Sequence, residues 1–121
     1  MNTKMPRRGD IWLINVDPTV GAEIQKTRPA VVLSSDALGK LPLKIIVPIT
    51  DWKDYFEENV WHVKIEPEKE TGLRKISAVD TLQVRSVDTK RFLKRIGICT
   101  KDLISEITSA LVALIEHQSN E

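Results

Sequence analysis

The sequence has a single cysteine and no long apolar run. Cys99 cannot form a disulfide within the chain, which favours a reducing, cytoplasmic setting. No stretch of about 18 apolar residues occurs, so we expect no membrane span. The basic segment Met1–Arg8 is followed by no apolar stretch, and we therefore predict that it is not a signal peptide.

Motifs for metal ions and bound cofactors are also missing. No group of Cys and His residues has metal-ligand spacing, and no glycine-rich loop of the phosphate-cradling kind is present. We expect neither a metal nor a cofactor. His62 and His117 lie in no triad-like pattern, so each is interpreted as structural.

The chain also has little net charge, at +1, but its charges are segregated. Arg74–Lys101 holds eight Lys and Arg residues against Asp80 and Asp88, whereas Asp51–Glu70 holds seven acids against three lysines. From Asp102 onward there are four acids and no Lys or Arg. This pattern predicts one face that attracts phosphate, with ordinary solvated faces as the alternative.

Length and composition favour one domain, residues 1–121. Hydrophobic residues make up 41% of the chain, enough for a small core. A domain of this size buries only about two-thirds of its unfolded surface, so a dimer interface would be a natural supplement.

Short β-prone runs separated by turn residues dominate the first hundred positions. The expected strands are Ile11–Val16, Ala30–Ser34, Lys44–Thr50, Val60–Ile65, Ile76–Val87 and Arg95–Cys99. Pro48 cannot donate a ladder hydrogen bond, which predicts an edge strand or a bulge there. Many short strands at this spacing predict a small barrel or sandwich.

The last part of the chain has helical periodicity. Thr100 is a candidate N-cap, and Asp102 suits the first turn. The apolar residues that recur at helical spacing are Leu103, Ile104, Ile107, Ala110, Leu111, Leu114 and Ile115. They predict an amphipathic helix of about four turns that closes the barrel or lines an interface.

Two side chains stand out as possible anion-binding groups. Arg28 precedes Pro29, which favours extended backbone at Arg28, and a guanidinium can hold a phosphate through two N–H groups. Thr50 ends a predicted strand, and its hydroxyl could hold a phosphate oxygen beside Arg28. The alternatives are a surface ion pair of Arg28 with Glu23 and a capping role for Thr50.

The loop before Arg28 and the later β-prone run supply further polar candidates. Glu23 could act as a general base, and the run Gln25-Lys26-Thr27 offers groups to bases or phosphates. Asp80, Gln83 and Arg85 lie on the predicted strand Ile76–Val87, where Gln83 and Arg85 share a face by period-two alternation. An amide beside a cation can read a base edge, although an exposed strand face is the alternative.

Three segments in order resemble the MazF/PemK family of endoribonuclease toxins. They are Gly9-Asp10-Ile11-Trp12 through Asp17-Pro18-Thr19, Gly21-x-Glu23 and Thr27-Arg28-Pro29; then Pro48-Ile49-Thr50; then Leu82-Gln83-Val84-Arg85-Ser86-Val87-Asp88. A terminal helix follows in both, so the likeness covers most of the chain.

This resemblance implies an SH3-like barrel with a C-terminal helix, of the kind shared by MazF and CcdB, that forms a homodimer in the cytoplasm. It implies metal-independent cleavage of single-stranded RNA at short preferred sequences. The 2′-hydroxyl would attack the adjacent phosphate and leave 2′,3′-cyclic phosphate and 5′-hydroxyl ends. The family's catalytic arginine and threonine fall on Arg28 and Thr50. A MazE-like antitoxin with an acidic disordered tail would neutralise the toxin, and operator DNA would be bound only through that complex.

The sequence departs from the family pattern at two places. Some members carry a histidine where this chain has Ala22, and an arginine where it has Ala78. The general base is thereby left open, with Glu23 as the candidate. The loop reads Glu23-Ile24-Gln25-Lys26 where Glu-Gln-Gly-Gly is frequent, which leaves the cleavage sequence open.

Two other functions fit a barrel of this kind. One is a toxin of the same fold that poisons a protein target such as DNA gyrase, and the other is a non-catalytic SH3-like binding module. The combination of Arg28 and Thr50 favours the nuclease.

Overall fold

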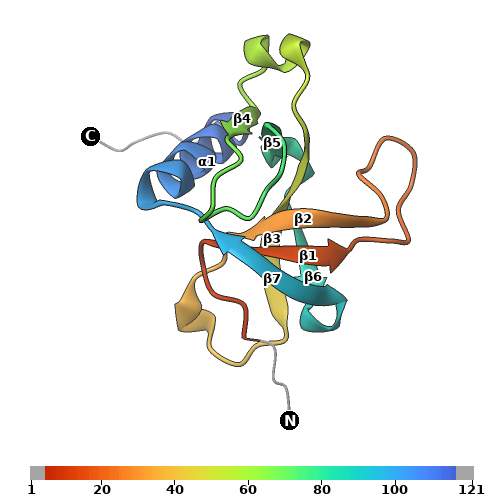
Figure 1. Ribbon diagram of the computed structural model, residues 1–121. Helices are drawn as coiled ribbons and strands as arrows, with labels where there is room; N and C mark the ends of the chain where they lie inside the picture. The colour runs from red at the N-terminus through yellow and green to blue at the C-terminus, as the bar shows by residue number, and fades with distance from the viewer. Residues whose placement is uncertain (1–4, 117–121) are drawn as a thin grey trace.

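Seven strands and one α-helix form within residues 5–116, the part of the chain that the computed structural model describes (Figure 1). The strands are β1 (Asp10–Asn15), β2 (Thr27–Val32), β3 (Leu43–Asp51), β4 (His62–Ile65), β5 (Ser77–Asp80), β6 (Arg85–Asp88) and β7 (Phe92–Ile98), and the helix is α1 (Lys101–Leu114). Short 3₁₀ turns interrupt the chain at η1 (Asp36–Leu38), η2 (Asp54–Glu58), η3 (Thr81–Gln83) and η4 (Thr89–Arg91). The predicted mainly β barrel with a C-terminal helix is confirmed.

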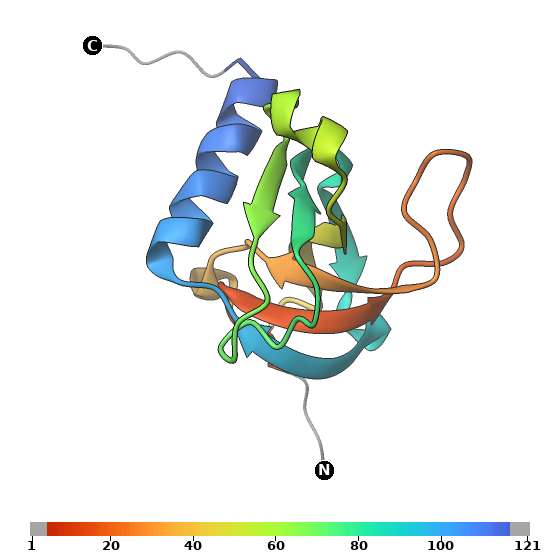
Figure 2. The ribbon, with the colours of Figure 1, turned by 45° about the horizontal axis from the view of Figure 1, so that its top comes forward.

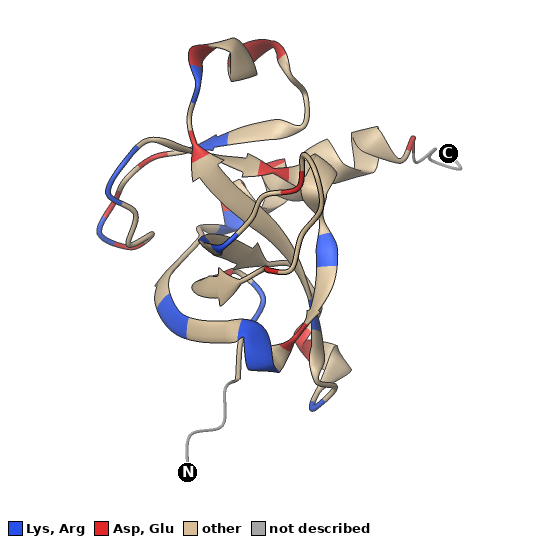
Figure 3. Ribbon diagram, turned by 90° about the vertical axis from the view of Figure 1, so that its right-hand side faces the viewer, with Lys and Arg blue, Asp and Glu red and all other residues tan. Residues whose placement is uncertain are grey.

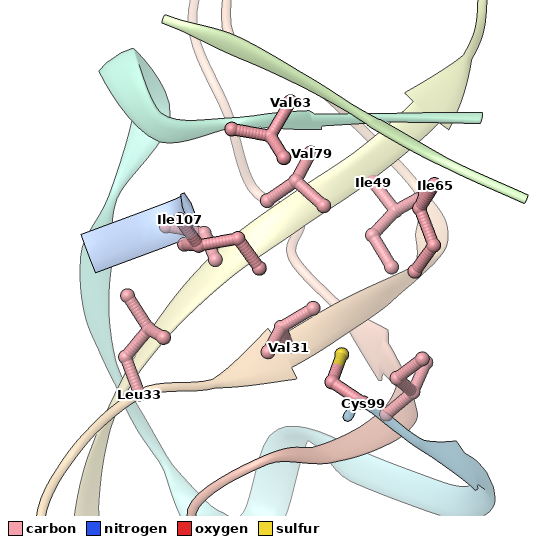
Figure 4. Close-up of a cluster of buried hydrophobic side chains, with 10 residues drawn as sticks. Val31, Leu33, Ile49, Val63, Ile65, Val79, Cys99 and Ile107 are labelled. Atoms are coloured by element: carbon pink, nitrogen blue, oxygen red, sulfur yellow. The ribbon is translucent and has the colours of Figure 1, made fainter. Parts of the chain in front are cut away.

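All strand pairs are antiparallel, in the order β4-β5-β3-β2-β1-β7, with β6 also paired to β3. The central strands β2 and β3 are apolar on both faces because both faces are covered. Successive residues of β2 enter different clusters, since Val31 belongs to the first and Val32 to the second. The first cluster is Ile11, Val31, Leu33, Val47, Ile49, Val63, Ile65, Val79, Cys99 and Ile107 (Figure 4). The second is Ile14, Val16, Ala30, Val32, Ile46, Val87 and Phe92.

Helix α1 covers the first cluster and lies along β4 (Figure 2). The Thr100 hydroxyl accepts the Leu103 N–H at 3.1 Å, so the predicted N-cap is confirmed. Ile107 is completely buried and is the residue of α1 that enters the core. No helix within residues 5–116 is long and apolar enough to cross a membrane. His117 lies outside the described residues.

The prediction of one long strand over Ile76–Val87 is wrong, because this segment forms two strands, β5 and β6, separated by η3. The break lies opposite Pro48. On that edge of β3, β6 pairs as far as Ile46 and β5 begins at Ile49. Pro48 therefore lies in a central strand rather than an edge strand, at the place where one partner strand is interrupted and no N–H is needed.

Three other strand boundaries also differ from the prediction. Strand β2 begins at Thr27 and ends at Val32. It therefore includes Pro29, which pairs with Leu13 of β1. Strand β7 begins at Phe92 and pairs with β1 over most of its length, while β4 is confined to His62–Ile65. Pairing with a neighbour, rather than local propensity, sets these ends.

The loop between β4 and β5 closes the barrel against β7. The Ile98 N–H donates to the Glu70 carbonyl at 2.7 Å. A Cβ on Gly97 would lie 2.2 Å from the Thr71 carbonyl oxygen, and one on Gly72 would lie 2.0 Å from the Ile96 carbonyl oxygen. The two backbones therefore touch directly, which only glycine permits at these positions.

Candidate RNA-binding site

Arg28 in β2 and Thr50 in β3 lie beyond the same end of the β2–β3 ladder. The ladder ends at the pair Ala30 and Pro48, and the same antiparallel register extended by two residues would bring Arg28 opposite Thr50. Both side chains project to the face of the second cluster, because Ala30 belongs to that cluster and residues two apart share a face. The two residues predicted from separate motifs therefore form a candidate pair just beyond the end of the β2–β3 ladder.

The guanidinium of Arg28 lies at the surface end of this pair. Its stem lies beside buried Ile14, which pairs with Arg28 across β1. Its Nε donates to the Gln25 carbonyl at 3.2 Å. Within residues 5–116 its two terminal amino groups have no hydrogen bond or ion pair, so they remain available to an anion.

The β1–β2 loop, residues 16–26, projects from the barrel beside this pair (Figure 1). Glu23 is exposed, and its carboxylate accepts the Val20 N–H at 2.6 Å. It makes no ion pair with Arg28 in the described structure. Gln25, Lys26 and Thr27 are exposed as well, and Lys26 has a positive φ of 70°. The loop therefore presents several polar groups next to Arg28.

A pocket of about 350 Å³ lies between this loop and η3. It is lined by Val16, Glu23, Ile24, Pro48, Leu82, Gln83, Val84 and Arg85. We call it the loop pocket. Pro48 lies two residues before Thr50 on the same side of β3, so the loop pocket adjoins the Arg28–Thr50 pair. A larger hollow of about 630 Å³ lies between α1 and β4 and includes none of the predicted site residues.

The predicted trio Asp80, Gln83 and Arg85 is divided by the break at η3. Asp80 ends β5 with only 7% of its surface exposed, and its Oδ1 accepts the Leu82 N–H at 3.1 Å. Gln83 lies in η3, and Arg85 begins β6. The expectation that Gln83 and Arg85 share one strand face is therefore wrong, although both line the loop pocket.

Two arginines hold the base of the β1–β2 loop. Arg85 Nη1 donates to the Val16 carbonyl at 3.1 Å. Arg91 Nη1 donates to the Asn15 carbonyl at 3.1 Å and also to the Asp17 carbonyl. Sequence reasoning missed Arg91 because its partners are more than 70 residues away, and no local signal marks such a contact.

Positive charge continues from this region along one strand. Lys90 and Arg91 lie in η4, and Lys94 and Arg95 follow in β7. Figure 3 shows the Lys and Arg positions of the ribbon in blue. The Arg95 Nε donates to buried Asp10 at 3.1 Å, so this cation is partly neutralised. Among residues 5–116, no three His, Cys, Asp or Glu side chains gather as a metal site.

The remaining titratable groups near the core are poorly suited to catalysis. Burial, together with the Asp10 carboxylate, raises the pKa of the Cys99 thiol to about 12, which makes it inert at neutral pH. Burial lowers the pKa of the His62 imidazole below its ordinary 6.5, against the opposing effect of Asp80. Phe56 stacks on His62 at 3.7 Å between ring centroids.

A model of the PemK-like, MazF-like toxins of type II toxin–antitoxin systems matches residues 7–115. The chain belongs to this toxin family. Endoribonuclease PemK of Escherichia coli is 29% identical over 110 residues, which cover 89% of this chain and 80% of that protein. Endoribonuclease MazF9 of Mycobacterium tuberculosis (strain ATCC 25618 / H37Rv) is 30% identical over 113 residues, covering 88% of this chain and 93% of MazF9.

The fold agrees with this assignment. A crystal structure of MazF from Deinococcus radiodurans superposes with a TM-score of 0.79 at 25% identity, and covers 95% of this chain and 100% of that one. The predicted membership of the MazF/PemK family and the predicted MazF-type barrel are therefore confirmed.

Proposed function

We propose that this toxin is a ribosome-independent endoribonuclease that cuts single-stranded RNA at short preferred sequences. The observation that supports the proposal is the register of β2 and β3, whose ladder ends two residues from both Arg28 and Thr50, at Pro48 of the loop pocket. The family match and the names of two curated relatives support the same activity.

The proposed reaction transfers a phosphoryl group within the RNA. The 2′-oxygen forms a bond to the adjacent phosphorus, and the bond from phosphorus to the 5′-oxygen breaks. The 2′-proton goes to a general base, and the leaving 5′-oxygen takes up a proton. The products are a 2′,3′-cyclic phosphate and a 5′-hydroxyl.

Arg28 and Thr50 would stabilise the negative charge that develops on the phosphate oxygens. A guanidinium with free terminal amino groups suits this role, because donors aimed at developing charge act more strongly in the transition state than in the substrate. Arg28 is a poor general base since it does not normally lose its proton. Glu23 is the proposed base, and it is one of the residues that line the loop pocket.

Exposed residues of the β1–β2 loop are proposed to contact the RNA. Gln25, Lys26 and Thr27 precede Arg28 and are open to solvent. Lys26 would bind phosphate as a point charge, whereas Gln25 would offer both a donor and an acceptor to a base edge. Arg85 is the candidate on the other side of the loop pocket.

Replacing Arg28 tests the site directly. Arg28→Ala is expected to lower kcat by about 10²–10³, the usual loss for one donor that stabilises an oxyanion. Arg28→Lys should retain part of the rate, because it keeps the charge and loses the two-pronged geometry. Arg74→Ala removes an exposed arginine from the β4–β5 loop and serves as the matched control.

Primer extension on a long RNA, incubated with pure protein and a chelator, reports whether and where the RNA is cut. Labelling of the product ends then shows whether a 5′-hydroxyl is formed. Wild-type cleavage rates in Arg28→Ala would refute the site. Intact RNA with wild-type protein, together with stabilised gyrase–DNA cleavage, would replace the nuclease with the protein-poisoning toxin.

We further propose an antitoxin partner, homodimer formation and a cytoplasmic location. Family membership in type II toxin–antitoxin systems supports the first. An antitoxin with an acidic disordered tail would occupy the cationic region around Arg28 and compete with RNA, and operator DNA would be bound only by that complex. Titration calorimetry in which RNA and antitoxin bind independently would exclude this arrangement.

A further inference from the structure

The side-chain amide of Gln83 connects the β1–β2 loop to Asp80 at the end of β5. Its Oε1 accepts the Ile24 N–H at 2.6 Å, across 59 positions of the chain. Its Nε2 donates to Asp80 Oδ2 at 3.1 Å. An amide oxygen can only accept and an amide nitrogen can only donate, so these two partners fix the orientation of the Gln83 side chain.

A second layer of groups fixes Asp80 in turn. The second carboxylate oxygen, Oδ1, accepts the Leu82 N–H, and Oδ2 lies 3.7 Å from Nε2 of His62. The Asn59 amide donates to Nδ1 of His62 at 3.1 Å, which leaves the His62 proton on Nε2, facing Asp80. A chain of polar contacts therefore runs from the β1–β2 loop to the end of η2.

This chain is shielded from water at its inner end. The side chains of His62 and Asp80 are 7% and 11% exposed, and the face of the His62 ring is covered by Phe56. Within residues 5–116, every buried side-chain nitrogen and oxygen has a hydrogen-bond partner. Asp80 is held by hydrogen bonds from Gln83 and Leu82, and His62 adds an electrostatic contact at 3.7 Å. Breaking either hydrogen bond would leave a buried carboxylate oxygen with one partner fewer, which favours one arrangement of the chain.

We propose that Gln83 is a positioning residue that orders the β1–β2 loop before RNA binds, with Asp80 and His62 setting the Gln83 side chain. The loop carries Glu23 and leads directly into Arg28, so its position sets the geometry of both. The consequence for RNA cleavage rests on the proposed function, whereas the ordering of the loop does not. Gln83 and Asp80 then act through the loop rather than by touching RNA.

The competing role, direct contact of Gln83 with RNA, makes a different prediction. A contact made only with RNA leaves the free protein unchanged and alters mainly KM. A positioning role changes the free protein, because the Ile24 amide loses its acceptor without any RNA present. The exchange of the Ile24 amide hydrogen therefore separates the two roles.

The experiment compares amide hydrogen exchange, measured by NMR without RNA, in the wild type and in Gln83→Ala. Exchange at Ile24 is expected to rise about tenfold, the factor that corresponds to losing one ordinary hydrogen bond. Ser86→Ala changes an exposed residue of β6 that does not line the loop pocket, and it should leave the Ile24 amide as protected as in the wild type. Equal protection of Ile24 in wild type and Gln83→Ala would overturn the proposal.

Two more variants test the inner part of the chain. His62→Phe keeps a ring to stack on Phe56 but removes both nitrogens, and it should raise Ile24 exchange by a smaller factor than Gln83→Ala. Gln83→Glu keeps an acceptor for Ile24 but faces the Asp80 carboxylate, so it should also lose protection. Unchanged Ile24 exchange in His62→Phe would limit the positioning role to Gln83 and overturn the part assigned to His62.

The same variants are then assayed on RNA. Gln83→Ala is expected to lower kcat together with any change in KM, and His62→Phe to lower kcat in the same direction although His62 does not line the loop pocket. If wild-type protein cuts no RNA, the proposed function fails while the exchange result stands. A rise in KM alone, with Ile24 still protected, would assign Gln83 to direct RNA contact.

Discussion

Two long loops of this barrel are held by different means. The β4–β5 loop touches β7 backbone to backbone at Gly72 and Gly97. The β1–β2 loop is held by side chains that reach its backbone, namely Gln83, Arg85 and Arg91. Backbone packing fixes the first loop as part of the barrel wall. The second loop is held by separate side-chain hydrogen bonds, each of which can break without breaking the others. The loop beside Arg28 is the second of these loops, and a loop held by separate side-chain contacts suits the proposed RNA site, which must open to admit its substrate.

The largest expected effect comes from a matched pair of glycines. Gly72 and Gly21 both have a positive φ, but a Cβ on Gly72 would meet the Ile96 carbonyl while one on Gly21 meets nothing within 4 Å. Gly21→Ala should cost about 1–2 kcal/mol of unfolding free energy from backbone strain alone. Gly72→Ala should cost about 1–3 kcal/mol more, because the backbones must also separate.

Urea unfolding of the two variants measures this difference. Equal unfolding free energies would mean that the β4–β5 loop is no more rigidly fixed than the β1–β2 loop. The proposed difference between the two loops would then be wrong.

A second pair compares the side-chain contacts of the loops. The Thr71 hydroxyl is buried and accepts the Glu68 N–H at 3.0 Å within the β4–β5 loop. Thr71→Val should cost about 1–3 kcal/mol, because buried partners are left unpaired. Arg91→Ala should cost only about 0.5–1.5 kcal/mol, since the carbonyls that it releases lie near water.

Lys90→Ala, an exposed neighbour in η4, is the control for Arg91→Ala. Chemical denaturation gives all three values, and a larger loss in Arg91→Ala than in Thr71→Val would reverse the expected order.

The smallest expected effect is a pH dependence at the inner end of the Gln83 chain. Burial lowers the pKa of His62, so between pH 6.5 and its lower folded-state pKa the unfolded chain binds a proton that the folded chain does not. The unfolding free energy should therefore fall as the pH drops below 6.5, and remain constant above it as far as this group is concerned.

Denaturation at several pH values between 5.5 and 8 measures this slope, and His62→Phe should flatten it. A slope that is the same in both proteins would mean that His62 does not contribute. Faster Ile24 exchange in the wild type at pH 5.5, after correction for the intrinsic pH dependence, would connect this titration to the β1–β2 loop rather than to the β4–β5 loop.

Local sequence signals predicted the elements whose causes are local. The helix followed from Thr100 and from the spacing of residues such as Ile107, and β3 followed from its apolar run. The signals failed where pairing decides the outcome. Pro48 predicted an edge strand or a bulge, yet it lies in a central strand because the partner strand on one side, rather than β3, is interrupted there.

The sequence by itself determined the family, the type of fold and the candidates for catalysis, Arg28, Thr50 and Glu23, because these depend on short motifs and on periodicity. Only the tertiary structure decided that Arg28 and Thr50 lie at the same end of the β2–β3 ladder, that Asp80 is buried, and that Gln83 holds Ile24. Those relations join residues up to 59 positions apart, and they arise from strand register and from the need of buried polar groups for partners. No local pattern encodes them.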